Sequence, residues 1–151
     1  MIKVFNPNFR ARIEKFFERQ YFMELVGFKL TLIEEGRTEG WLDLKQSHKQ
    51  QTGMVHGGVT ASLADVVAGF AAYTAVPDDC HVVTGELKIS YFNPGIGQKL
   101  HAIGTVIKQG KKINFCEAEI WCINAEERTL IAKASTSMVT IFPGDIPVSK
   151  D

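Results

Sequence analysis

The feature that most constrains the fold is a single acidic residue inside an apolar segment. From Gly57 to Val76 the chain has no proline and no charged residue except Asp65. Its small and apolar residues cover every helical face, which predicts a helix that a sheet buries on all sides. A carboxylate there is costly unless it is paired, hydrogen-bonded or open to a cleft, and Asp65 lies too far along the helix to cap it. Its presence therefore indicates a functional placement or a buried structural hydrogen bond.

The length and charge of the chain limit the number of domains and the kinds of partner that can be expected. The 151 residues are enough for one compact domain with a hydrophobic core, and we expect a single domain over residues 1–151. The 17 basic and 17 acidic residues balance, so no overall field attracts nucleic acid or an anionic membrane. Three cysteines without a CxxC pair are typical of a reducing compartment, and the N-terminus shows no secretory apolar run. We therefore expect a cytoplasmic protein without nucleic-acid or membrane partners.

The remaining elements follow from periodicity and turn residues. Asn6 and Pro7 predict the start of an N-terminal helix over about residues 7–22. The central helix is expected over about residues 57–76. Alternating apolar residues predict strands over residues 28–32, 39–44, 81–92, 99–108, 111–123 and 129–141. Short turns between the last four strands favour an antiparallel meander in which consecutive strands pair.

Two strands, a long apolar helix and four more strands describe a sheet curled around a central helix. Gln50 stands six positions before His56-Gly57-Gly58, and Asp65 follows on the helix. With Thr84 and the segment Tyr91-Phe92-Asn93-Pro94, this pattern resembles the PaaI-like acyl-CoA thioesterases over nearly the whole chain. The resemblance implies an α+β hotdog fold, hydrolysis of acyl-CoA to free acid and CoA, and a homodimer, commonly associated further as a homotetramer.

The same residues suggest how a thioester would be cleaved. Gly57 and Gly58 open the central helix, where backbone N–H groups lack intrahelical partners and can stabilise a thioester oxygen as it gains charge. Asp65 can deprotonate water as a general base or attack the carbonyl as a nucleophile, and the sequence leaves both routes open. Gln50 can orient the carbonyl or the water, and Thr84 can give a hydroxyl to the same water.

The histidines allow other interpretations. His56 can fix the glycine turn by hydrogen bonding, or it can act as the base of an enoyl-CoA hydratase or dehydratase on the same fold. A noncatalytic module that binds acyl-CoA is a further alternative. No carboxylate or thiol completes a metal-ligand spacing with His48 and His56, or with His81 and His101, so we expect no metal. No cofactor is expected either, because coenzyme A is part of the substrate.

Substrate binding is predicted in two places. Lys108, Lys111 and Lys112 flank a glycine turn, and with Lys88 they are candidates for the phosphates of coenzyme A. The acyl group is expected along the interface of helix and sheet. Its candidate lining residues, which core packing explains equally well, are Met54, Phe70, Tyr73 and Val83.

Helix geometry predicts that the site needs two copies of the chain. Gly57 and Asp65 are eight residues apart, which is about 12 Å along a helix axis. A base must lie within hydrogen-bond reach of the water that attacks the bound carbonyl, so both residues cannot easily serve one site from one protomer. A two-fold dimer with antiparallel central helices would bring Gly57 of one chain near Asp65 of the other.

Overall fold

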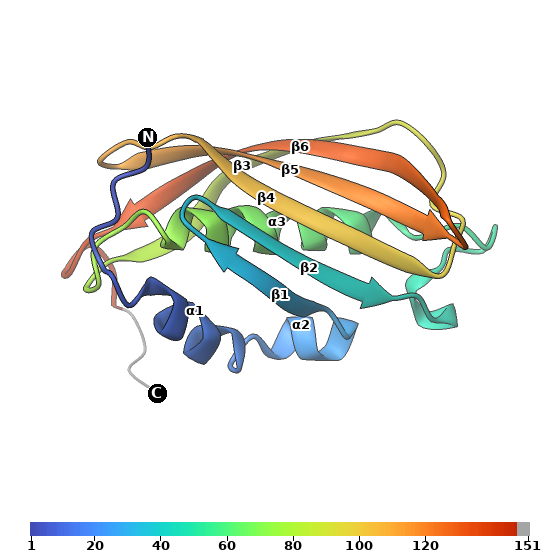
Figure 1. Cartoon of the computed structure of the whole chain (residues 1–151), viewed down its shortest axis with the longest axis horizontal. Helices are drawn as coiled ribbons and strands as arrows, with labels where there is room; N and C mark the ends of the chain where they lie inside the picture. Colours follow the sequence, from blue (N-terminus) through green and yellow to red (C-terminus); the bar gives the residue numbers. More distant parts are fainter. Residues whose placement is uncertain (148–151) are drawn as a thin grey trace.

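A long helix, α3 (Gly57–Tyr73), lies against a curved sheet in a computed structural model that describes residues 1–147 (Figure 1). Residues 148–151 of the expected domain are outside the described part. The sheet within it has six antiparallel strands, which make the α+β hotdog fold that the sequence predicted. These strands are β1 (Lys29–Glu34), β2 (Arg37–Asp43), β3 (His81–Tyr91), β4 (Lys99–Lys108), β5 (Ile113–Asn124) and β6 (Glu127–Ile141).

The order of strands confirms the expected meander for β4, β5 and β6, which pair consecutively, and corrects the place of β3. The sheet runs β1-β2-β4-β5-β6-β3, so β3 pairs with β6 instead of with its successor β4. The connection from β3 to β4 crosses the ends of two strands: the N–H of Phe92 donates to the carbonyl of Ile131, and that of Gln98 to Ile123 (2.8 and 2.9 Å). Turn residues show where the chain reverses but not which strand it joins next, and β4 already has β2 and β5 on its two sides. Strand β3 is therefore left at an edge of the sheet.

Helix α3 approaches the sheet most closely at β4. Gly104 leaves no side chain between the two elements, since a Cβ atom there would lie 2.4 Å from the backbone of Val67. The buried hydroxyl of Thr38, on the neighbouring strand β2, donates to the carbonyl of Val67 (2.7 Å). These contacts fix the height of α3 above the sheet. Within residues 1–147, neither α3 nor a shorter helix has the length and apolar character needed to cross a membrane.

One face of α3 is open, which corrects the expectation of a helix buried on all sides. Gly58 is exposed, and Ser62, Asp65, Gly69 and Tyr73 are only half-buried. Their spacing of three and four residues places them in one stripe along the helix. We call these five residues the open stripe. Small residues make up most of it, so its hydropathy does not distinguish it from the covered faces.

The N-terminal region forms two helices where one was expected over residues 7–22. Helix α1 spans Phe9–Phe17 and helix α2 spans Tyr21–Val26. The first ends in a tightened turn, in which the N–H groups of Arg19 and Gln20 donate to carbonyls three residues back. The change of direction allows Met23, at 3% exposure, to enter the core.

Other boundaries differ only slightly from the prediction. The N-terminal helix begins at Phe9, and the side chain of Asn6 accepts a hydrogen bond from the N–H of Asn8 just before it (2.8 Å). Helix α3 ends at Tyr73 rather than near residue 76. The observed strands start and end within two residues of their predicted limits. All three cysteines are buried and unpaired.

Two glycine-to-alanine changes test the contact between helix and sheet. Gly104→Ala should lower the free energy of unfolding by about 1–3 kcal/mol, because its methyl group would push against the backbone of α3. The matched variant Gly69→Ala should raise it by about 0.5–1 kcal/mol, since this helical position has open space around the added Cβ. Urea unfolding of both variants measures the difference. Equal effects would contradict the close approach at Gly104.

Candidate functional site

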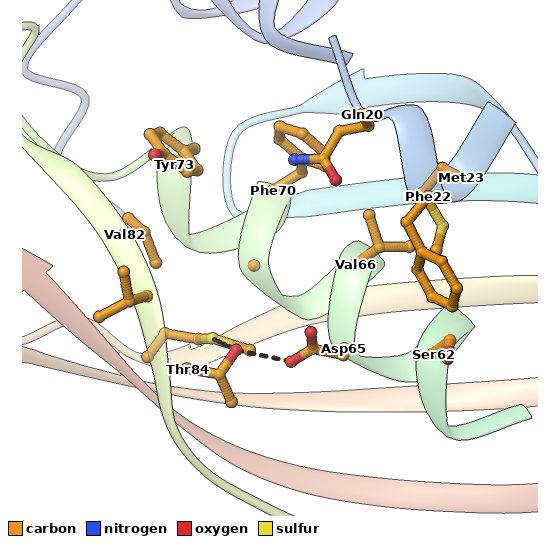
Figure 2. A pocket seen from close by; sticks show the side chains of 13 residues that line it. Gln20, Phe22, Met23, Ser62, Asp65, Val66, Phe70, Tyr73, Val82 and Thr84 are labelled. Atoms are coloured by element: carbon orange, nitrogen blue, oxygen red, sulfur yellow. Dashed lines mark hydrogen bonds between the residues drawn. The ribbon is translucent and has the colours of Figure 1, made fainter. Parts of the chain in front are cut away.

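The Asp65 carboxylate faces a cavity instead of being enclosed by core side chains. The hydroxyl of Thr84 on β3 donates to Asp65 Oδ1 at 2.6 Å (Figure 2). The cavity next to this pair has a volume of about 200 Å³ and lies between α3, β3 and α2. Asp65 is the one charged side chain in its wall, which is otherwise formed by Gln20, Phe22, Met23, Ser62, Val66, Gly69, Phe70, Tyr73, Val82, Val83, Thr84 and Met138.

The part of this cavity nearest the C-terminal end of α3 is uncharged. The hydroxyl of Tyr73 lies 3.2 Å from Nδ1 of His81. Burial raises the pKa of the Tyr73 phenol. Burial also lowers the pKa of His81, and the nearby Arg12 guanidinium lowers it further. Both side chains therefore stay neutral near pH 7, and Tyr73, the one of the pair that lines the cavity, presents an uncharged surface to it.

The start of α3 forms the second part of the candidate site. His56 is the N-cap residue, and its Nδ1 accepts a hydrogen bond from the N–H of Gly58 at 2.9 Å. The Gly58 amide is thus engaged within the chain. The N–H of Gly57 has no acceptor among the described residues. Of the two glycine amides that the sequence nominated, Gly57 is the one free to bind a thioester oxygen.

A larger cavity of about 600 Å³ opens beside Gly57. Gln50 is held next to it by a tight turn, in which the N–H of Gln50 donates to the carbonyl of Met54 (2.9 Å) and Gly53 has a positive φ of 82°. The wall of this cavity comprises Gln50, Met54, Val55, Gly57, Gly58, Thr60, Tyr91, Phe92, Asn93, Pro94, Gly95 and Ile131.

The loop before α3 is anchored by a buried histidine. His48 is 5% exposed, and its Nδ1 accepts a hydrogen bond from the N–H of Lys45. Its Nε2 lies 2.7 Å from the carbonyl of Val26, and its own carbonyl accepts from the N–H of His56. Both ring nitrogens are occupied by protein groups. His48 therefore holds the loop that carries Gln50.

The structure joins the predicted residues in two pairs. Asp65 and Thr84 share one cavity, and Gln50 and Gly57 share the other. Neither cavity contains members of both pairs, and about 12 Å of helix separates Gly57 from Asp65. We call the two groups the acid half-site and the amide half-site. One protomer thus carries both halves of a hydrolytic site at separate places.

The predicted substrate-binding residues divide in the same way. Val83 lines the cavity of the acid half-site and Met54 that of the amide half-site. Lys88 lines a different cavity, formed by β3, β5 and β6. The lysines at 108, 111 and 112 surround the turn between β4 and β5, whose Gln109 side chain donates to the carbonyl of Ala75 beyond the end of α3. None of these lysines lines either half-site of its own protomer.

Among the residues at the acid half-site that were not nominated from the sequence are Ser62, Gln20 and Phe22. Ser62 precedes Asp65 by three positions, and its hydroxyl donates to the carbonyl of Gly58 (2.7 Å). Helical spacing alone could have found it. Gln20 and Phe22 reach the cavity from the segment around the start of α2 (Figure 2), through packing between distant parts of the chain that leaves no local signal.

Comparison with known proteins gives one family. A model of the thioesterase superfamily matches residues 52–128. A predicted esterase of Saccharolobus solfataricus is 30% identical over 108 residues, covering 71% of this chain and 76% of that protein. The 1,4-dihydroxy-2-naphthoyl-CoA thioesterase 2 of Arabidopsis thaliana is 28% identical over 125 residues, covering 81% of this chain and 78% of the relative.

Solved structures agree on the fold. A thioesterase family protein from Silicibacter pomeroyi has a TM-score of 0.87 at 23% identity, covering 89% of this chain and 98% of its own. The PaaI protein of Escherichia coli, from the phenylacetic acid degradation operon, has a TM-score of 0.79 at 20% identity, covering 91% and 96%. The predicted resemblance to PaaI-like proteins is thus confirmed at the level of fold.

Substitution of His56 tests its role at the start of α3. His56→Ala should lower the free energy of unfolding by about 1 kcal/mol, because the N–H of Gly58 loses its acceptor. His56→Asn should retain most of the stability, since asparagine is among the best N-cap residues. Thermal and urea unfolding compare the three proteins. Stability unchanged in the alanine variant would contradict the capping role.

Proposed function

The chain belongs to the thioesterase superfamily, and from this premise we propose that it hydrolyses acyl-CoA thioesters to the free acid and CoA. The single observation that carries the proposal is the Asp65–Thr84 hydrogen bond at the wall of a cavity in which Asp65 is the one charged side chain. Family membership supports hydrolysis of a thioester. A CoA leaving group is supported by relatives named as CoA thioesterases, among them the Arabidopsis protein.

The amide half-site would polarise the substrate. The thioester oxygen would accept a hydrogen bond from the Gly57 N–H at the positive end of α3, with the Gln50 side chain beside it. Glycine lets the carbonyl approach this backbone closely. The charge that develops on the oxygen would then be stabilised by a donor that needs no rearrangement during the reaction.

The acid half-site would supply the attack. Thr84 donates to Asp65 Oδ1. The second carboxylate oxygen points away from Thr84, toward the cavity (Figure 2). This oxygen would take a proton from water as the hydroxide adds to the carbonyl, or would add itself to give a mixed anhydride that water then cleaves. In both routes the carbon–sulfur bond breaks and the sulfur leaves as CoA thiolate. The proton of the attacking water, held by Asp65 in the first route and released as water cleaves the anhydride in the second, then restores the thiol and leaves Asp65 as a carboxylate. The reaction needs no cofactor beyond the CoA of the substrate.

Joining the two half-sites requires a second protomer. Among residues 1–147 the edge strand β3 has one side unpaired, and the open stripe of α3 lies beside it with Asp65 at its centre. A two-fold dimer through β3 with antiparallel α3 helices would place Gly57 of each chain opposite Asp65 of its partner. Each dimer would then contain two complete sites.

The geometry favours hydrolysis over hydration by His56. A general base needs a free lone pair. Nδ1 of His56 already accepts the hydrogen bond from Gly58, so the neutral ring carries its proton on Nε2. Asp65, in contrast, has a carboxylate oxygen beyond the one that Thr84 binds. The carboxylate is the better base at this site.

Removing the carboxylate is the direct test. Asp65→Asn should lower kcat/KM for acyl-CoA hydrolysis by about 10²–10⁴-fold, because the amide can neither accept the proton nor attack the carbonyl. Release of free thiol from a panel of acyl-CoA esters measures the rate. Asp43→Asn, at a surface ion pair with Lys99, is the matched control and should be fully active. An Asp65→Asn variant that is folded and fully active would refute the proposal.

Mixed dimers test the shared site. Asp65→Asn and Gln50→Ala chains with different tags are co-expressed and purified through both tags. Each mixed dimer should regain about half of the wild-type activity, because one of its two sites then receives a normal Gln50 from one chain and a normal Asp65 from the other. Homodimers of either variant serve as the baseline. Mixed dimers no more active than this baseline would place the whole site within one protomer.

A further inference from the structure

Tyr91, the last residue of β3, reaches the start of α3. Its hydroxyl donates to the carbonyl of Gly57 at 2.6 Å. The ring also packs against this residue, since a Cβ atom on Gly57 would lie 3.2 Å from the Tyr91 hydroxyl oxygen. Tyr91 is thus a contact from the sheet to the one residue whose free N–H is assigned to the thioester oxygen.

A bulge in β3 makes this contact possible. Thr84 and Tyr91 are seven positions apart, and in a regular strand an odd separation places two side chains on opposite faces. The register shifts between Thr84, opposite Met138, and Glu86, opposite Ser137, so Gly85 is an extra residue. The bulge therefore turns both side chains toward α3, Thr84 to Asp65 and Tyr91 to Gly57.

The peptide groups on both sides of Gly57 are held by hydrogen bonds. Before it, the carbonyl of His56 accepts from the N–H of Val59 (3.0 Å). After it, the N–H of Gly58 donates to Nδ1 of His56, and the carbonyl of Gly57 accepts from Tyr91. Glycine has the greatest conformational freedom of all residues, so the direction of its N–H depends on the hydrogen bonds that hold the neighbouring peptide groups. Among these hydrogen bonds, the one from Tyr91 is the one whose donor lies on the sheet.

Satisfying a buried carbonyl does not explain the Tyr91 hydrogen bond. The helix offers the Gly57 carbonyl an N–H donor four residues later, and Gly57 is only half-buried. Tyr91 is itself 52% exposed. The partial burial of its ring raises the pKa of the phenol, so the hydroxyl stays protonated and remains a donor at neutral and mildly alkaline pH.

We propose that Tyr91 is a positioning residue for hydrolysis, which fixes the Gly57 N–H in the direction where the thioester oxygen gains charge. The inference rests on the proposed function and adds a residue to it. Its physical basis is preorganisation: a donor that already points at the developing charge stabilises the transition state without being reoriented. Because the effect is greatest in the transition state, it should appear in kcat more than in KM.

The kinetic test compares two tyrosine-to-phenylalanine variants. Tyr91→Phe removes only the hydroxyl and should lower kcat about ten-fold with little change in KM, a smaller loss than deleting an oxyanion donor outright. Tyr21→Phe, at a tyrosine that is 68% exposed on α2 and lines neither half-site, should equal the wild type. Equal kcat values for the two variants would overturn the proposal. A wild type that hydrolyses no acyl-CoA would refute the proposed function, and this inference with it.

A spectroscopic measurement distinguishes a loss of positioning at Gly57 from a general loss of structure in the variant. In the Asp65→Asn background, a bound acyl-CoA persists long enough for its thioester carbonyl stretch to be measured by infrared difference spectroscopy. The amide half-site should shift this band to lower frequency, and adding Tyr91→Phe should return it toward the value in water. A band that Tyr91→Phe leaves unmoved would overturn the proposal.

If Tyr91→Phe does not fold, a difluorinated tyrosine at position 91 keeps the shape of the side chain and tests the same donor. Fluorination lowers the phenol pKa, so kcat should fall as pH rises through that value, where the deprotonated oxygen can no longer donate to the Gly57 carbonyl. A pH profile identical to that of the wild type would count against the proposal.

Discussion

The position of α3 over β4 is the constraint on which the candidate site depends. At Gly104 the helix backbone rests on the strand with no side chain between them, and Thr38 ties the same turn of helix to β2. This contact determines the geometry of both half-sites. Gly57 and Asp65 lie on α3, and their hydrogen-bond partners Tyr91 and Thr84 lie on the sheet. A shift of the helix would disturb both hydrogen bonds together.

The bulge at Gly85 lets one strand contact α3 both at its first residue and at its middle. Without it, β3 could direct either Thr84 or Tyr91 toward α3, but not both. A side chain at Gly85 would lie 2.8 Å from a methyl group of Val139, so the extra residue is itself held close to β6. The geometry of an edge strand, which carries little of the core, therefore determines the positions of two hydrogen bonds at the candidate site.

The sequence predicted the local features and two of the three pairings among the last four strands, and it missed the partner of β3. The single charge at Asp65 and the apolar run around it identified α3, and the spacing of Gln50, Gly57 and Asp65 selected residues that the structure places at two cavity walls. The predicted meander was wrong at β3 alone, because the residues of the 92–98 connection indicate a reversal but not its crossing over the ends of β5 and β6. That Gly58 is engaged by His56 depends on a side-chain rotamer, which no spacing reveals.

The open stripe explains how the chain tolerates an acid in so apolar a helix. In one protomer Asp65 faces a cavity and solvent, so its charge keeps part of its hydration and needs no cation. In the proposed dimer the partner would cover this stripe and remove water from the carboxylate, while the Thr84 hydrogen bond would remain. A less hydrated carboxylate is a stronger base and a better nucleophile toward a carbonyl held nearby. Assembly would therefore complete the site and activate its acid in the same step, so that neither half-site alone would be a hydrolase.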